Sequence, residues 1–227
     1  MKLKDKAKPK VPQMEPGTYI GLCVGIYGIG EQENTFKDKT RYVEQIVFTF
    51  EFPSVSVEID GEEKPRQLSR TFTASTSEKS GLRKFLKSWR GKDFPNEEEM
   101  GGFEIFDMLG LSAMLNVVQN DKGYSNIESV MPLPKGMPDP STATELKKFD
   151  VDDWDDHTPF EDLPEWIQEK IKNSSQYKRD HAPDMPVDFP DGSQDPEDEE
   201  PAETPASAAK AAFEKWAKRQ AGTEVPF

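Results

Sequence analysis

The sequence predicts a mainly β domain followed by an acidic, largely disordered tail. Apolar residues alternate with a period of two on both sides of one helical stretch, in the order three strands, helix, two strands. Charge also divides the chain, since residues 1–148 hold 21 Lys and Arg against 22 Asp and Glu, whereas residues 149–227 hold 8 against 21. With 34% hydrophobic residues and 19 prolines, the chain cannot bury its whole length in a core.

Three strands are expected before the helix. In Thr18–Tyr27 ("TYIGLCVGIY") large apolar residues alternate with other residues, and the repeated glycines are typical of a strongly bent strand. The stretch "RYVEQIVFTFEF" (residues 41–52) has one apolar face, formed by Ile46, Phe48, Phe50 and Phe52. A hairpin turn at Asp60-Gly61 leads to a third strand over residues 65–75.

The period then changes to that of a helix, which we expect Ser77 to cap and Gly91 to end. Its apolar stripe is formed by Leu82, Phe85, Leu86 and Trp89. A short helical turn is expected near Phe103–Leu109, and two strands follow, "LSAMLNVVQ" and "YSNIESVMPL", joined by a turn at residues 120–123. This order is that of an OB-fold, a five-stranded antiparallel barrel with its helix between the third and fourth strands. An open antiparallel sheet with a helix on one side has the same order and stays an alternative.

Composition divides the chain into four parts. Residues 1–14 form a basic flexible arm, and residues 15–135 form the OB-like domain. Residues 136–181 are rich in Pro and Asp and hold an aromatic cluster and one expected helix at Glu165–Lys172. Residues 182–227 form an acidic tail, predicted to be disordered apart from a short helix in "ASAAKAAFEKWAKR".

The sequence gives no sign of catalysis, cofactor binding or a membrane span. Its two histidines, His157 and His181, lie in the acidic third, and Cys23 lies in an apolar run typical of a core. "GIYGIG" has neither the spacing nor the following helix of a nucleotide-binding loop. In the aspartate run that begins at Asp150, Trp154 stands at position five and Asp155 replaces the glycine of a calcium loop, so we expect no metal site. A lone thiol and no long apolar segment indicate a cytoplasmic protein.

Binding of single-stranded nucleic acid agrees better with the near-neutral first part. Cations attract phosphates, and aromatic rings stack on unpaired bases for about 1–3 kcal/mol each. The candidate DNA-binding residues are the cations Lys37, Lys39, Arg41, Arg66, Arg70, Lys79, Arg83, Lys87, Arg90 and Lys122 and the aromatics Tyr27, Tyr42, Phe72 and Tyr124. Four of the cations recur three or four residues apart on the expected helix, although such a face can also be a merely solvated one.

The end of the chain carries a resemblance. Bacterial single-stranded DNA-binding proteins have an OB-fold body and an acidic tail that ends in Pro-Phe, and "DGSQDPEDEEPAE" with the terminal "EVPF" resembles that arrangement. The resemblance implies that Val225, Pro226 and Phe227 bind partner proteins, with the Phe ring in an apolar pocket. This chain departs from the usual tip in having a basic helix before it and a single adjacent acid, Glu224.

The body resembles a second family through "LRKFLKSWRGKDF", "MLNVVQNDKGYSNIESVMPLPKGMP" and "LPEWIQEKI". These segments are similar to small proteins from the replication modules of tailed bacteriophages, over roughly residues 15–178, and some of those proteins are assigned as single-stranded DNA-binding proteins. The resemblance implies sequence-independent binding of single-stranded DNA in phage replication or recombination, in the host cytoplasm. An adaptor that binds only proteins is the alternative, a nuclease that uses the aspartate run is a remote third, and a homo-oligomer is compatible with either of the first two.

Overall fold

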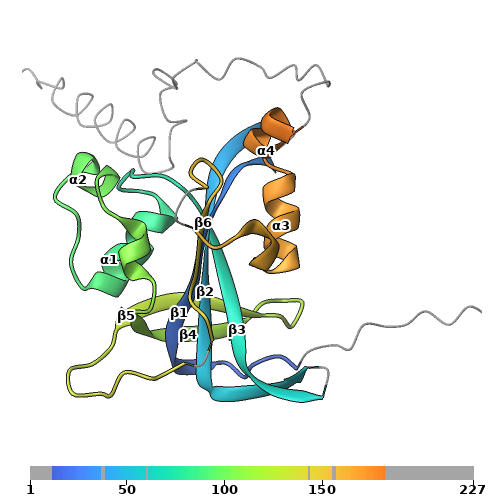
Figure 1. Ribbon diagram of the computed structural model, residues 1–227. Helices are drawn as coiled ribbons and strands as arrows, with labels where there is room; N and C mark the ends of the chain where they lie inside the picture. Colours follow the sequence, from blue (N-terminus) through green and yellow to red (C-terminus); the bar gives the residue numbers. More distant parts are fainter. Residues whose placement is uncertain (1–11, 37–38, 60, 143, 155–156, 182–227) are drawn as a thin grey trace, which may run out of the picture. The chain divides into compact units, whose positions relative to one another are not determined.

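The computed structural model describes residues 12–36, 39–59, 61–142, 144–154 and 157–181, all within the compact unit Met1–Met185. In chain order the elements are β1 (Gly17–Phe36), β2 (Lys39–Ile59), β3 (Glu62–Thr73), α1 (Gly81–Arg90), α2 (Glu97–Gly101), the 3₁₀ turn η1 (Ile105–Met108), β4 (Ser112–Gln119), β5 (Ser125–Pro132), β6 (Lys147–Asp150), the 3₁₀ turn η2 (Phe160–Asp162), α3 (Glu165–Lys172) and α4 (Ser175–His181) (Figure 1).

Strand β1 is the centre of a mainly antiparallel sheet with the order β3-β2-β1-β4-β5. It changes partners along its length: Gly17–Leu22 pairs with β4, and from Leu22 onward β1 pairs with β2. Gly21 lies next to this change, where a Cβ would come within 2.6 Å of Leu115 Cδ1. The glycine-rich strand that the sequence predicts at Thr18–Tyr27 is confirmed, and it continues to Phe36.

The sheet is not closed into a barrel. Among the described residues no hydrogen-bonded ladder joins β3 to β5. The two strands still contact each other, and Arg70 Nη1 on β3 donates a hydrogen bond of 2.5 Å to Glu128 O on β5. We call this contact the β3–β5 seam. The predicted order of strands and helix is confirmed, whereas the predicted closure is absent from the part of the chain that the structure describes.

The first core lies between the sheet and α1. Alternate residues of β2 enter it from one face, and the rings of Phe50 and Trp89 lie 5.1 Å apart, centre to centre. Gly91 ends α1 with a φ of 70°, as predicted. The predicted N-cap is wrong, because Ser80 rather than Ser77 accepts the capping hydrogen bond, from Arg83 N at 3.0 Å.

A second core covers the opposite face of the β1–β2 hairpin. β6 pairs parallel with β1 over Gly25–Gly28, and α3 and α4 contact β1 (Figure 1). The buried members of this core are Tyr27, Ile29, Val47, Phe149, Val151, Leu163, Ile167 and Ile171. Helix α3 has the predicted bounds, but β6 and α4 lie in a region where the sequence predicts only that helix and linker. The segment after Pro140 is therefore part of the packed body as far as His181.

Within the described ranges, no helix is both long and apolar enough to cross a membrane.

Candidate nucleic-acid interface

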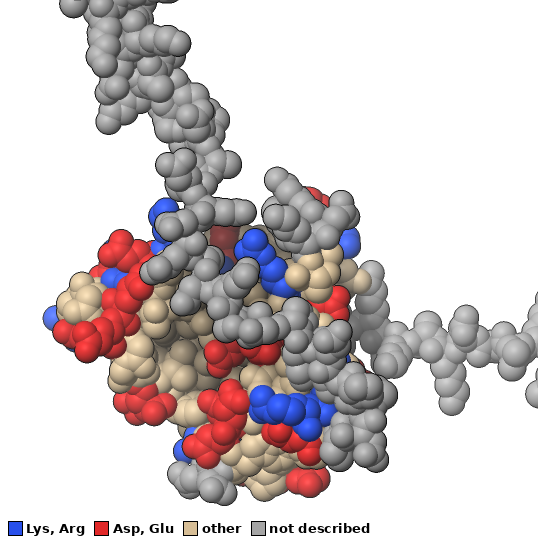
Figure 2. All heavy atoms as spheres, turned by 90° about the horizontal axis from the view of Figure 1, so that it is seen from above, with Lys and Arg blue, Asp and Glu red and all other residues tan. Residues whose placement is uncertain are grey.

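On the face in Figure 2, the charged side chains that can be seen are mixed rather than segregated. Lys and Arg form small separate groups among Asp and Glu there, and the described residues in view show no continuous basic band. A path for a phosphate backbone would have to follow individual cations. The position and bonding of each predicted residue therefore decide whether it can reach DNA.

Two of the predicted stacking residues are core residues. Tyr27 is 3% exposed and belongs to the second core, and burial raises the pKa of its hydroxyl. Phe72 is 6% exposed, and its ring centre lies 4.7 Å from that of Phe85 in the first core. Neither ring has a free face for a base in this conformation. We correct the prediction accordingly, because their strand positions point them into the two cores.

Arg83 is also a structural residue rather than a surface cation. Its side chain is 4% exposed. The guanidinium donates hydrogen bonds to Asp93 Oδ1 at 3.2 Å, to Thr76 O at 3.3 Å and to Phe94 O at 2.8 Å. It thus joins the loops on both sides of α1, and the prediction that it contacts phosphate does not agree with this burial.

The other cations of the predicted stripe differ from one another. Lys79 is exposed just before α1 begins. Arg90 is half-buried, with its guanidinium carbon 4.1 Å from the ring centre of Phe94 and 4.9 Å from that of Phe103. Lys87 is exposed in the last turn, where a cation also offsets the negative end of the helix dipole. Lys79 and Lys87 are the members of the stripe whose side chains are exposed.

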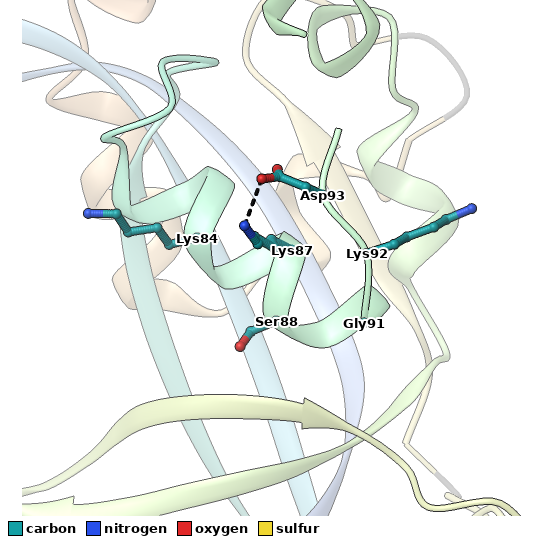
Figure 3. A pocket seen from close by; sticks show the side chains of 6 residues that line it. All are labelled: Lys84, Lys87, Ser88, Gly91, Lys92 and Asp93. Atoms are coloured by element: carbon teal, nitrogen blue, oxygen red, sulfur yellow. Dashed lines mark hydrogen bonds and ion pairs between the residues drawn. The ribbon is translucent and has the colours of Figure 1, made fainter. Parts of the chain in front are cut away.

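A shallow hollow of about 580 Å³ lies at the C-terminal end of α1 (Figure 3). Lys87 Nζ and Asp93 Oδ2 lie 2.8 Å apart at its edge, and this ion pair, chiefly, lowers the pKa of Asp93 to about 2. Lys84 and Lys92 also line the hollow, and Figure 3 shows their ammonium groups pointing outward to opposite sides. We call Lys84, Lys87 and Lys92 the α1 lysines. Sequence reasoning named only Lys87 as a contact, although the charge of its neighbours was visible.

Two half-buried arginines lie on β3, and one of them, Arg70, forms the β3–β5 seam. The guanidinium carbon of Arg70 lies 4.9 Å from the ring centre of Phe72 and 5.6 Å from that of Phe85, and burial lowers its pKa. Burial also lowers the pKa of Arg66, whose Nε is buried without a hydrogen-bond partner among the described residues. Both side chains are half-buried cations at an open strand edge.

The remaining predicted residues lie at two hairpin turns. Lys122 and Tyr124 are exposed in the β4–β5 turn, where Asn120 Oδ1 accepts hydrogen bonds from both of their backbone amides. Tyr124 is 51% exposed and Tyr42 is 47% exposed, so each offers a ring to solvent. Arg41 and Tyr42 lie near the far end of the β1–β2 hairpin. Lys37 lies outside the described residues, and of Lys39 only the backbone, at the start of β2, is described.

Strand β5 brings several of these positions together. At its C-terminal end, Pro132 Cγ would lie 3.3 Å from a Cβ on Gly91, next to the α1 lysines. In the middle of β5, Glu128 O accepts the hydrogen bond from Arg70. The turn that carries Lys122 and Tyr124 comes immediately before its first residue, Ser125. We define the β5 surface as the α1 lysines with Arg70, Lys122 and Tyr124. Arg41 and Tyr42 are not part of it.

At Glu51, the face of β2 opposite the first core is covered by the segment that follows β5, a contact that the sequence did not predict. Glu51 is fully buried, and its carboxylate accepts hydrogen bonds from Thr142 Oγ1, Thr144 Oγ1 and Gln67 Nε2. The segment after β5 is thereby fixed across β2. No short sequence motif predicts the contact between Glu51 and Thr142, because these residues are 91 positions apart.

Two other kinds of site, a nucleophilic thiol and a metal centre, were also considered among the described residues. Cys23 is fully buried, and burial raises the pKa of its thiol, which disfavours the nucleophilic thiolate. Among the described residues no group of three His, Cys, Asp or Glu could hold a metal ion, and Asp155 and Asp156 of the aspartate run lie outside them. No known protein family, curated protein or solved structure matches this chain.

Proposed function

We propose that this protein binds single-stranded DNA without sequence preference along the β5 surface. The observation that carries the proposal is the placement of cations and an exposed tyrosine along one strand of a sheet with the order β3-β2-β1-β4-β5. With its helix between β3 and β4, that order is the order of an OB-fold, and we propose that the body is an OB-type barrel left open at the β3–β5 seam.

The chemistry of this surface fits a single strand. The α1 lysines and Lys122 would bind phosphates at the two ends of β5, and Tyr124 would stack on a base. Arg70 would supply charge in the middle, next to the exposed polar residues of β5. Because these contacts address phosphate groups and the flat faces of bases, they do not discriminate between sequences. The proposed role is coating and protection of unwound DNA in phage replication or recombination, in the host cytoplasm.

The tip Val225–Phe227 is proposed to recruit replication or recombination proteins, and it lies outside the described residues. A protein-only adaptor is the second candidate function. The mixed charge in Figure 2 and the exposed Trp154 and Trp166 favour it, since exposed tryptophans are common at protein interfaces. Neither proposal involves catalysis or a cofactor.

The test is a titration of fluorescent oligo-thymidine with the full chain at several salt concentrations, followed by anisotropy. Five cations on the β5 surface predict saturable binding with a log–log salt slope of up to about −3.5, from about −0.7 for each phosphate contacted. Masking of the surface by the acidic tail is controlled with a full-length variant. Its substitutions are Asp195→Asn, Glu197→Gln, Asp198→Asn, Glu199→Gln and Glu200→Gln. Absence of binding in both proteins at low salt would leave the adaptor as the better proposal.

A further inference from the structure

A second hollow, of about 770 Å³, lies between η1 and the segment that begins with β6. We call it the acidic hollow; its lining residues are Phe103, Glu104, Ile105, Phe106, Asp107, Leu109, Lys148, Asp150, Asp153 and His157. Both of its walls belong to the described body. Neither the β5 surface nor the terminal tip uses this hollow.

The charge of the acidic hollow is unbalanced. Four carboxylates line it against one lysine and one histidine. Burial, followed by the negative charges of Asp152 and Asp153, raises the pKa of Asp150, although a backbone hydrogen bond from Asp152 and the nearby His157 oppose this. A site in which a carboxylate is disfavoured by burial and by like charges attracts a cation and repels phosphate. Nucleic acid is therefore a poor ligand for this hollow.

Aromatic rings form the other part of its lining. The rings of Phe106 and His157 meet edge to face with their centres 5.2 Å apart, and Lys148 Nζ lies 5.9 Å from the ring centre of Phe106. Such rings bind apolar and aromatic side chains and attract cations over their faces. The ligand that fits carboxylates and rings together is a peptide segment that carries both Lys or Arg and large aromatic residues.

The chain itself contains such a segment at residues 206–219. "ASAAKAAFEKWAKR" carries the cations Lys210, Lys215, Lys218 and Arg219 with a single acid, and its aromatic residues are Phe213 and Trp216. Phe213 and Trp216 are three residues apart and would share one face of a helix. The rest of the sequence after His181 is acidic, so this segment has the opposite charge to both the hollow and its own surroundings.

The linker between His181 and this segment is long enough for the segment to reach the hollow. The last described residue, His181, stacks on Trp154 with ring centres 5.7 Å apart, and Trp154 follows Asp153 of the lining. The 24 residues at 182–205 are rich in Pro, Asp and Glu, a composition for which about 3.1 Å per residue gives a maximum reach of about 74 Å. We propose that residues 206–219 dock in the acidic hollow of their own chain. This inference does not depend on DNA binding.

The basic N-terminal arm is a poorer occupant. It carries five lysines but no aromatic residue. It also joins the body at the start of β5, where Met14 N donates a hydrogen bond of 2.8 Å to Ser125 Oγ. A second copy of the chain could supply the same basic segment in trans. The experiment must therefore distinguish the three sources.

Carbodiimide cross-linking of the full chain tests the proposal, because it joins lysines only to carboxylates in direct contact. We expect cross-links from Lys210, Lys215 and Lys218 to Glu104, Asp107 and Asp153, about tenfold more abundant than cross-links to the exposed Glu97, Glu98 and Glu99 of α2. A mixture of ¹⁴N- and ¹⁵N-labelled chains should give the links within one chain. Equal linkage to all exposed acids, links between chains only, or links from the arm instead would each overturn the proposal.

Aromatic variants provide the second measurement. In the proposed complex, Phe213→Ala with Trp216→Ala removes the rings that fill the hollow, and every cross-linking lysine remains. We expect the links to the lining residues to fall about tenfold. The matched control is Thr204→Ala with Gln220→Ala, which lies outside the segment and should change nothing. Unchanged linkage in the aromatic variant would show that the lysines meet these acids by charge alone and would overturn specific docking.

Discussion

The two cores of this protein share the same pair of strands and use opposite faces of them. Phe48 of β2 points into the first core, between the sheet and α1, and its neighbour Val47 points into the second, beneath α3. Successive side chains of a strand point to opposite faces, so a hairpin that is buried on both sides must be apolar on both sides. The first core is built by residues of the predicted strands and helix, whereas the second depends on a late segment of the chain that returns to β1.

A truncation in the first core should destabilise the protein most. Phe48 is fully buried and contacts the rings of Phe72, Phe85 and Trp89. Phe48→Ala should lower the free energy of unfolding by about 4 kcal/mol, because apolar burial is removed and a cavity is left behind. Urea unfolding followed by circular dichroism measures this decrease. The exposed Tyr42 lies on the same strand, and Tyr42→Ala should stay within about 0.5 kcal/mol of the wild type; equal decreases in the two variants would contradict the assignment of the core.

We expect the second core to unfold as a separate cooperative unit. Ile167 is fully buried on α3, and Ile167→Ala should cost about 3 kcal/mol. We expect hydrogen exchange to accelerate in β6, α3 and α4 and to stay unchanged in α1, because local opening need not unfold the first core. Trp166→Ala is the control, since that neighbouring side chain is 40% exposed. Equal acceleration in α1 would show that the two cores unfold together.

The first core could be predicted from the sequence because its signals are local. The alternation in β2, the helical spacing of α1 and the turn at Gly123 are each read within a dozen residues. β6 gives no such signal: it is four residues long, "KKFD", and becomes a strand only because β1 offers a parallel edge at Gly25–Gly28. Likewise, α4 is stabilised by stacking of Tyr177 and His181 on Trp154 rather than by an apolar stripe.

The candidate site was harder to predict than the fold for the same reason. Arg83 and Lys87 look equivalent on a helical wheel, and what buries Arg83 is a set of acceptors in loops seven to eleven residues away. Tyr27 has the sequence context of an exposed strand end, but the second core covers its side chain. Which member of a basic or aromatic pattern is available to a ligand depends on tertiary contacts that a sequence pattern does not contain.

Charge reversal compares the two regions as DNA-binding surfaces. Changing the three α1 lysines to Glu should weaken oligo-thymidine binding about thirtyfold, or about 2 kcal/mol, and reduce the salt slope by about 0.7 for each phosphate that is no longer bound. The matched control reverses three cations of the second region, Lys170, Lys172 and Lys178, with the same change in net charge. Equal weakening by the two triple variants would mean that net charge, and not the β5 surface, sets the affinity.

A smaller effect distinguishes the regions by pH. Burial raises the pKa of Asp150 in the second region, so the folded state holds this proton more tightly than the unfolded state does. Its contribution to stability is therefore full below the unfolded pKa and is lost as the pH rises through the higher folded value. Asp150→Asn keeps the hydrogen-bond acceptor for Asp152 N and removes the charge, so it should stabilise the second region at pH 7, measured as slower hydrogen exchange in α3 and β6. Faster exchange in this variant would contradict the assignment.

Asp93 in the first region should show the opposite dependence and the smallest effect. Lys87, then the amide of Phe94 and Arg83, lower its pKa to about 2, so the unfolded state binds the proton more tightly than the folded state does. The stability that this carboxylate contributes is present above its ordinary pKa, near 4, and is lost as the pH falls toward 2. Asp93→Asn should consequently unfold at a lower urea concentration than the wild type at pH 6, and the difference should shrink below pH 4. Asn keeps an acceptor for the amide of Phe94, so a difference that persists unchanged at pH 2.5 would show that the stabilisation by Asp93 does not depend on its charge.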